Sequence, residues 1–435
     1  MNKKRILAGL ISCTFILSSC VKYDKSWETV PTTERAPLPE LDPPEDPESD
    51  PYAEGLVSAF FSGLLGREPT EEELGNNALL ISTGSKTPRQ LVLEITEGEE
   101  FAGRNLSDTG FVECLCISLL GEEPADAVTD FWVNGMEDGT SRETVIRSFL
   151  EYEEFNDLCE AFGYPAGESD TEEEDTQDID TEEIKDLLLS ISEEEDEGDE
   201  ELHLTSIGGF APSITAICDI SDAVAELSEE NIDVGFLLID LETGYGLYYN
   251  PWQTFYTASS IKGPYAASFC CLNRDSAEGW ENTIKNMLIN SDNDAYTSLN
   301  DTYGRTYIKE WCEMAGIDPA PCNYKYPYFG ARDMSLLWLL NYEFFTEDEY
   351  GQEVRTWFQT PVYSLINGEL GELYVTESKA GWMTDEEPRH KTTCDSGIVY
   401  ADNGTYIISI VSDSPSTIDP LRPLMQALNA AHDEM

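Results

Sequence analysis

A run of acidic residues divides this chain in two. Between Glu168 and Glu201 the sequence holds nineteen aspartates and glutamates against one lysine, broken mainly by the apolar stretch 187–191. Such a run repels itself and offers too little apolar surface to form a core. We therefore expect residues 164–205 to be a solvated, disordered linker between two folded parts. No stretch within it has the spacing of a calcium-binding loop, so we expect no metal site there.

The composition of the whole chain is nevertheless that of a globular protein. Of the 435 residues, 40% are hydrophobic and 11% aromatic, which is enough for two domains with cores of their own. The formal net charge is −61. Nucleic acid and anionic lipid surfaces would be repelled by this charge, which excludes nucleic-acid binding as a function.

The first twenty residues have the layout of a bacterial lipoprotein signal. Basic residues 3–5 precede an apolar run, and Ser18 and Ser19 lead to Cys20. The apolar run is too short for a permanent membrane helix, and Cys20 resembles the cysteine that is lipidated in such proteins. We expect residues 1–20 to be the signal peptide and the protein to be anchored on the extracytoplasmic face of a bacterial cell membrane. In the alternative, a cleaved secretory signal, Cys20 is incidental.

An internal repeat follows residues 21–52, whose prolines and acids predict an extended linker. The sequence FFSGLLGREP at 60–69 is echoed by CISLLGEEP at 116–124, and both copies close with Glu-Glu-Phe. Apolar residues between these marks have helical spacing. The copies resemble the LLGREP-type helical repeats of bacterial surface proteins, a domain without an assigned function. We expect residues 53–163 to be an all-α module that acts as a spacer or binds a surface partner.

Residues 206–435 hold the candidate chemistry, beginning with Ser259 and Lys262. In a helix this spacing places both side chains on one face, one turn apart. A serine nucleophile needs a base, and the three histidines of the chain stand beside the acidic linker, in a charged loop and near the C-terminus: His203, His390 and His432. A lysine with a depressed pKa is therefore the available base.

Two further motifs follow Ser-x-x-Lys in order. Ser291-Asp292-Asn293 comes after a helical stretch, and Lys379-Ala380-Gly381 comes after an apolar-rich, strand-like stretch. The three motifs together resemble the set of class A β-lactamases and penicillin-binding proteins. The resemblance covers residues from about 206 to 432. It implies an α/β (α+β) fold, with an antiparallel sheet flanked by helices, and an acyl-enzyme mechanism without a cofactor.

The resemblance assigns four catalytic roles. Ser259 is expected to be the nucleophile and Lys262 the amine that takes its proton. Ser291 is expected to relay a proton to the leaving group. Lys379 would attract a substrate carboxylate and lower the pKa of neighbouring groups.

The remaining motif residues are expected to bind the substrate. Asn293 would hydrogen-bond its amide, whereas Asp292 is read as structural. Ala380, Gly381 and Trp382 would border the reacting carbonyl, with an oxyanion hole formed by the N–H groups of Trp382 and the nucleophile. Ala380 stands where a hydroxyl residue is usual, which weakens selection for a substrate carboxylate.

A second departure concerns release of the acyl group. The segment between residues 316 and 334 resembles the loop that carries the deacylating glutamate of class A enzymes, but it lacks Glu-x-x-Leu-Asn. Its carboxylates are Asp318 and Asp333, and we read Asp333 as a helix cap. Without a base for water the acyl-enzyme should persist. The 32 residues from Ser259 to Ser291 are also few, which suggests a reduced helical part and a more open cleft.

We therefore predict a surface-anchored serine hydrolase that acts on a cell-wall peptide or related amide. The alternatives are a β-lactamase that hydrolyses antibiotics and a largely non-catalytic binding lipoprotein. The missing glutamate favours the binding protein, and the intact motif residues oppose it. The cysteines after Cys20 show no zinc-ligand spacing; for a disulfide, the first choice is Cys312 with Cys322.

Overall fold

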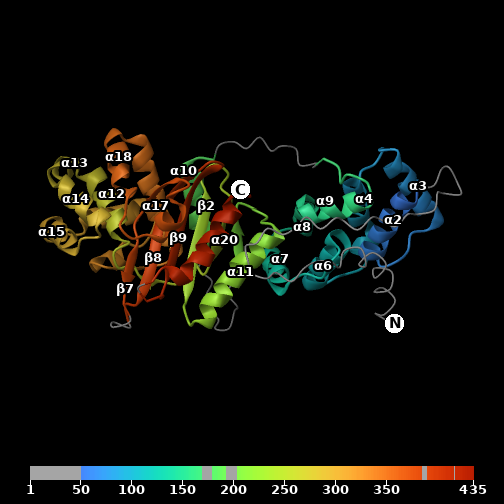
Figure 1. Cartoon of the computed structure of the whole chain (residues 1–435), viewed down its shortest axis with the longest axis horizontal. Helices are drawn as coiled ribbons and strands as arrows, with labels where there is room; N and C mark the ends of the chain where they lie inside the picture. The colour runs from blue at the N-terminus through green and yellow to red at the C-terminus, as the bar shows by residue number, and fades with distance from the viewer. Residues whose placement is uncertain (1–49, 169–178, 193–202, 385–388, 416) are drawn as a thin grey trace. The chain divides into compact units, whose positions relative to one another are not determined.

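The computed structural model describes residues 50–168, 179–192, 203–384, 389–415 and 417–435. The chain forms two compact units, divided between residues 172 and 173 (Figure 1). Cys20 and most of the expected linker 21–52 lie outside the described residues. Within the described ranges, no helix combines the length and apolarity needed to cross a membrane.

The described part of the first unit is helical, as expected. Its two sequence copies share an irregular feature: an α-helix runs into a π-helical turn that ends on a glycine in the left-handed conformation, Gly66 in one copy and Gly121 in the other. The helices are α2 (Pro51–Phe60), η1 (Phe61–Leu65), α3 (Glu71–Ser82), α4 (Pro88–Thr96), α5 (Glu99–Ala102), α6 (Asp108–Leu115), η2 (Cys116–Leu120), α7 (Asp126–Glu137), α8 (Arg142–Glu151) and α9 (Glu153–Ala161).

The two copies pack against each other through these turns. A Cβ atom at Gly63 in η1 would come within 2.5 Å of Ser118 Oγ in η2, so only a glycine permits this approach. Phe60 stacks on Phe155 with ring centroids 6.2 Å apart. The repeated sequence thus builds one core from both copies.

The second unit is built on an antiparallel sheet with the order β1-β3-β2-β9-β8-β6, and β7 pairs with β8. β2 is buried along its whole length because helices cover both faces of the sheet. The strands are β1 (Thr205–Ile207), β2 (Val234–Asp240), β3 (Gly246–Tyr249), β6 (Val375–Ser378), β7 (Gly381–Met383), β8 (Thr392–Ala401) and β9 (Gly404–Ser412). The expected antiparallel sheet flanked by helices is confirmed.

Two helices, α11 (Ile214–Glu229) and α20 (Arg422–His432), lie together on one face of this sheet (Figure 1). The other face is covered by α17 (Ala331–Glu347), which packs on β2, β8 and β9 and is buried over most of its length. Packed on α17 are α12 (Lys262–Leu272), α16 (Thr306–Ala315) and α18 (Glu349–Val354). Farther from the sheet lie α13 (Arg274–Ala277), α14 (Glu281–Ile289) and α15 (Asn293–Tyr303). The site described below lies between the sheet and this helical group.

The acidic segment is not a linker throughout, which corrects the expectation for residues 164–205. Residues Thr181–Ser190 form helix α10, whose first N–H groups are capped by the Asp180 carboxylate. The apolar side chains Ile184 and Leu188, spaced i, i+4, are buried in the core of the second unit. The acidic residues 182, 183 and 186 are exposed. Amphipathic spacing thus outweighs the charge density here.

Candidate active site

Ser259 stands in a tight turn between a short ladder and helix α12. The ladder pairs β4 (Phe255–Tyr256) with β5 (Tyr328–Phe329). Thr257 then donates both its N–H and its hydroxyl to the carbonyl of Pro327, at 3.0 and 2.9 Å. Ala258 has a φ of 44°, a left-handed conformation that is uncommon for a residue with a side chain. These contacts fix the turn and leave Ser259 half-buried.

Lys262 begins α12 one turn beyond the serine. Its N–H donates to the carbonyl of Ser259 at 3.1 Å, and its side chain is fully buried. The Nζ atom bonds to the Ser291 carbonyl and to Asn293 Oδ1, each at 2.7 Å. Burial, and to a smaller extent the nearby positive charge of Lys379, lower the pKa of Lys262 to about 7. A large fraction of this amine is therefore neutral at physiological pH and able to accept a proton.

Lys379 follows strand β6 and is also buried. Its Nζ donates to Ser291 Oγ at 3.1 Å and to the carbonyl of Ala380 at 2.6 Å. Burial lowers the pKa of Lys379 to about 8, and the charge of Asp395 opposes this shift. Ser291 therefore accepts a hydrogen bond from each lysine: its hydroxyl accepts from Lys379 and its carbonyl accepts from Lys262.

Ser291 and its neighbours form the start of helix α15. Ser291 has a φ of 54°, and the Asp292 carboxylate caps the helix by accepting from the N–H of Ala295 at 2.6 Å. Asp292 is therefore structural, as expected. The cap places Asn293 at the first helical position, where its Oδ1 reaches Lys262.

Strand β7 brings the third motif against Ser259. A Cβ atom at Gly381 would lie 2.6 Å from the backbone nitrogen of Ser259, so the two backbones are in contact. Trp382 is the next residue in β7, and its ring packs on Tyr363 at a centroid distance of 4.3 Å. Ser259 and Trp382, whose N–H groups are expected to form an oxyanion hole, are thus carried by adjoining segments. Ala380 itself is buried.

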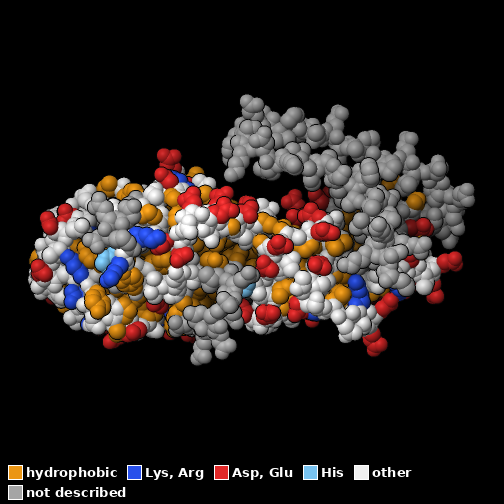
Figure 2. Space-filling model, turned by 90° about the horizontal axis from the view of Figure 1, so that it is seen from below, with side chains coloured by type: hydrophobic (Ala, Val, Ile, Leu, Met, Phe, Trp, Pro, Cys, Tyr) orange, Lys and Arg blue, Asp and Glu red, His pale blue; other side chains and the backbone are white. Residues whose placement is uncertain are grey.

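The segment 316–334 contributes aromatic residues to this region. The Tyr326 hydroxyl lies 3.3 Å from Asn293 Oδ1, and its ring lies beside Tyr256 and Tyr296. Tyr256 also stacks on His390 at 4.5 Å. Figure 2 shows lysine and arginine side chains gathered at the same end of the second unit as a histidine, whereas acidic side chains predominate elsewhere on that face.

The two carboxylates of this segment have other partners. Asp318 accepts the N–H of Ala320 at 2.9 Å, and Asp333 pairs with the side chain of Arg332 at 3.2 Å. Asp333 lies in the first turn of α17, but the N-cap is Gly330, so the interpretation of Asp333 as the cap is wrong. Gly330 takes this position because a Cβ there would collide with the carbonyl of Pro251.

Asp395 is a buried carboxyl that the sequence interpretation missed. It lies on β8, only 1% exposed, and its Oδ2 accepts from the Ser364 hydroxyl at 2.6 Å and the N–H of Ile366 at 3.1 Å. Burial raises the pKa of Asp395 to about 6, against these hydrogen bonds and the charge of Lys379. The available signal was an aspartate inside a strand-like stretch that continues with the apolar residues 398–401.

Hydrogen bonds thus join Lys262, Ser291, Asn293 and Lys379, and the backbone contact of Gly381 brings Ser259 to the same place. The predicted pair Cys312 and Cys322 lies side by side with sulfurs 3.7 Å apart, but both thiols are free. The expected disulfide is therefore not formed in this structure, since a bond needs about 2.05 Å.

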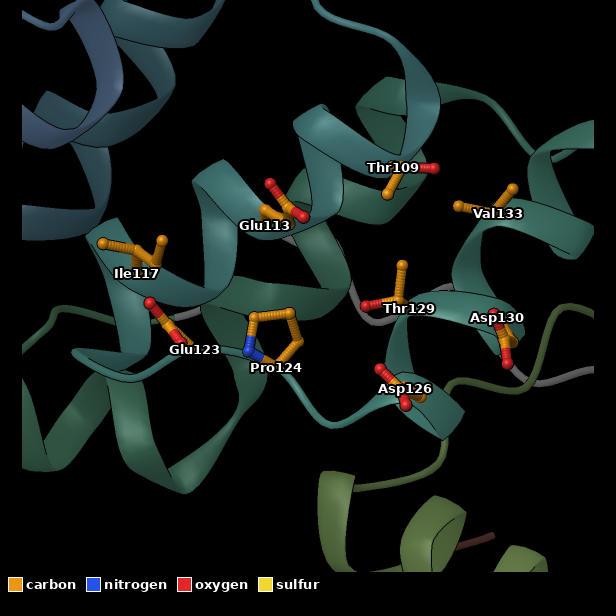
Figure 3. A pocket seen from close by; sticks show the side chains of 9 residues that line it. All are labelled: Thr109, Glu113, Ile117, Glu123, Pro124, Asp126, Thr129, Asp130 and Val133. Atoms are coloured by element: carbon orange, nitrogen blue, oxygen red, sulfur yellow. The ribbon is translucent and has the colours of Figure 1, made fainter. Parts of the chain in front are cut away.

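The first unit contains a separate hollow of about 550 Å³ between α6 and α7. Figure 3 shows its lining side chains, which include four carboxylates: Glu113, Glu123, Asp126 and Asp130. The lining residues contain neither a lysine nor a histidine to act as a base for a serine nucleophile. We therefore place the candidate chemistry in the second unit.

Comparisons with known proteins agree with this division. Residues 99–159, the second repeat copy, match the model of a domain of unknown function, DUF4214. A β-lactamase from Sphaerobacter thermophilus DSM 20745 is 15% identical, with a TM-score of 0.39, over 50% of this chain and 95% of its own. A β-lactamase from Chitinophaga pinensis DSM 2588 is 13% identical, with a TM-score of 0.41, over 50% of this chain and 97% of its own. PBP-A is 16% identical, with a TM-score of 0.42, over 50% of this chain and 97% of its own. No curated protein matches the chain.

The family match in the second unit spans residues 271–431, so it includes the second and third motifs and begins after Ser259 and Lys262. The model is described as the β-lactamase enzyme family. The chain is therefore multidomain, with a helical N-terminal region and a C-terminal α/β fold in which residues 271–431 match the model of the β-lactamase enzyme family.

Proposed function

We propose that this protein is a serine hydrolase that forms an acyl-enzyme at Ser259 and acts on a peptide or related amide of the bacterial cell wall. The observation that carries the proposal is the buried amine of Lys262, one turn from the serine, with a pKa of about 7. A lysine with an ordinary pKa would be almost fully charged at neutral pH and unable to accept the proton of the serine.

The chemistry follows from the arrangement of the groups. Ser259 Oγ attacks the substrate carbonyl, and its proton passes to the neutral amine of Lys262. The negative charge that develops on the carbonyl oxygen is stabilised by the N–H groups of Ser259 and Trp382. As the C–N bond breaks, the proton returns through the Ser291 hydroxyl to the leaving nitrogen, assisted by the positive charge of Lys379. Water then releases the acyl group.

The residues near the site offer little help to the water that releases the acyl group, which favours a peptidase-like or slowly turning-over site over a β-lactamase. Asp318 and Asp333 are held by a backbone N–H and by Arg332, and the segment that contains them presents Tyr326 to Asn293 instead of a carboxylate. A tyrosine is a poor base at neutral pH, and burial raises the pKa of Tyr326. A penicilloyl group should accordingly remain on the serine.

Acylation can be tested by incubating the purified full-length chain with a fluorescent penicillin and measuring intact mass. We expect a single adduct that persists for minutes, and none on Ser259→Ala. An adduct that clears within seconds would support a β-lactamase. A wild-type chain that forms no adduct would instead support the binding-protein alternative and sink the acyl-enzyme mechanism.

We further propose that Cys20 is lipidated and anchors the protein on the outer side of the membrane. This rests on the signal-like residues 1–20 alone. In cells fed a labelled fatty acid, the wild-type chain should incorporate label and Cys20→Ser should not. Equal labelling of both would refute the anchor without affecting the proposal for Ser259.

A further inference from the structure

The side-chain oxygen of Asn293 has two donors. Lys262 Nζ lies 2.7 Å from this Oδ1 atom, and the Tyr326 hydroxyl lies 3.3 Å from it. In a carboxamide the oxygen only accepts hydrogen bonds and the nitrogen only donates them. Because both neighbours donate to the oxygen, the amide nitrogen of Asn293 faces away from them.

The Tyr326 hydroxyl is held in place by its surroundings. The half-buried ring lies between Tyr296 and Tyr256, with centroids 5.4 and 6.0 Å away, and Lys325 Nζ lies 5.5 Å from the ring centroid. Two residues later the chain enters β5, where Tyr328 pairs with Tyr256. The same ladder leads into the Ser259 turn, so the hydroxyl and the nucleophile are positioned by one element.

We propose that Tyr326 is a positioning residue that fixes the orientation of the Asn293 carboxamide and thereby selects acyl donors with an amide carbonyl beside the scissile bond. The inference rests on the proposed acyl-enzyme function. With its oxygen occupied, Asn293 presents N–H groups to the substrate. A donor with an amide carbonyl satisfies them, whereas a donor that lacks it leaves them unpaired.

The hydrogen bond is long, which sets the size of the expected effect. At 3.3 Å it exceeds the usual range for O–H···O, whereas the lysine bond at 2.7 Å is short. Such bonds in empty sites tighten when substrate binds. Loss of one neutral hydrogen bond corresponds to about a 3- to 10-fold change in rate.

Two β-lactams separate this role from a general effect on catalysis. Benzylpenicillin carries a side-chain amide, whereas 6-aminopenicillanic acid has the same reactive ring and carboxylate with a free amine. In Tyr326→Phe we expect acylation by benzylpenicillin to fall about 3- to 10-fold and acylation by 6-aminopenicillanic acid to stay unchanged. The readout is the ratio of the two acylation rates, measured by intact mass on the full-length chain.

Tyr328→Phe is the matched control. Its hydroxyl donates to the carbonyl of Arg389 at 2.8 Å, so its removal should leave the ratio unchanged. The single variant Asn293→Ala should lose the preference for benzylpenicillin over 6-aminopenicillanic acid. The double variant Asn293→Ala/Tyr326→Phe should have the same ratio of acylation rates as Asn293→Ala. Thermal melting establishes that each variant is folded.

The outcomes distinguish the two proposals. An unchanged ratio in folded Tyr326→Phe, or equal losses for both β-lactams, overturns the positioning role while the acyl-enzyme stands. If neither β-lactam acylates the wild-type chain, the proposed function itself fails.

Discussion

A methyl group at Gly381 would lie 2.6 Å from the backbone nitrogen of Ser259. Gly381→Ala should therefore push β7 away from Ser259 and move the N–H of Trp382 out of the proposed oxyanion hole. We expect penicillin acylation to fall about 100-fold, the usual cost of losing one such donor. Gly368→Ala in α19 (Leu365–Leu370) is the control, because an added Cβ meets nothing within 4 Å there. Acylation of Gly381→Ala within twofold of wild type would contradict the proposed hole.

The acylation rate should depend on pH as a narrow bell. The proposed mechanism needs neutral Lys262, so the rate should rise as pH increases through the Lys262 pKa of about 7. The proposed mechanism also needs charged Lys379, so the rate should fall as pH increases through the Lys379 pKa of about 8. Stopped-flow measurement of acylation from pH 5 to 10 tests this.

Lys379→Arg identifies the second limb of the bell. A guanidinium stays charged throughout this range, so any remaining acylation should lose its alkaline limb and keep the acidic one. A rate that does not vary with pH in the wild-type chain would mean that neither lysine titrates during catalysis.

Buried Asp395 should make the second unit less stable at neutral pH. Its pKa in the folded chain is about 6, against an ordinary value of 3.8. The stability it contributes is fully present below about pH 4, where the carboxyl is neutral, and is lost as pH rises through 6. The folded and unfolded pKa of Asp395 differ by about 2, which corresponds to a change of at most about 3 kcal/mol in the free energy of unfolding.

Asp395→Asn should therefore gain stability relative to wild type between pH 4 and pH 7.5, by up to about 3 kcal/mol in urea denaturation. Asp402→Asn is the comparison, because this aspartate is exposed in the turn between β8 and β9. A stability difference between Asp395→Asn and wild type that does not change with pH would show that the carboxyl does not change charge on unfolding.

Helix α10 should contribute to the stability of the second unit. Leu188 is fully buried, so Leu188→Ala should lower the free energy of unfolding by about 2 to 5 kcal/mol. Asp186→Ala on the exposed side of the same helix should change it by less than about 0.5 kcal/mol. Equal effects in thermal melting would argue against the packed position of α10.

The sequence predicts much of the fold because the main elements have clear patterns. The helical character of residues 53–163 follows from their apolar spacing, and the described part of this region is helical. Helix α10 was not predicted, because the high charge density of residues 168–201 obscured the i, i+4 spacing of Ile184 and Leu188. Its burial depends on a surface formed by α17, far along the chain.

The residues of the candidate site that belong to sequence motifs could be predicted. The residues that join the site through long-range contacts could not. The sequence order of the motifs indicated Lys262, Ser291 and Lys379, whose hydrogen bonds now appear together. No local pattern connects Tyr326 to Asn293, because β5 must first pair with β4. The collision that excludes side chains at Gly381 likewise appears only once two distant segments meet.

Helix α10 also sets where the second unit has to begin if it is transferred to another protein. A gene fusion that joined the second unit to another protein at residue 203 would leave behind Ile184 and Leu188 and expose the apolar surface that they cover. It would also remove the carbonyl of Leu188, to which Arg332 Nε donates at 2.9 Å. A functional graft, natural or engineered, therefore has to start before residue 179, inside the acidic segment that otherwise looks dispensable.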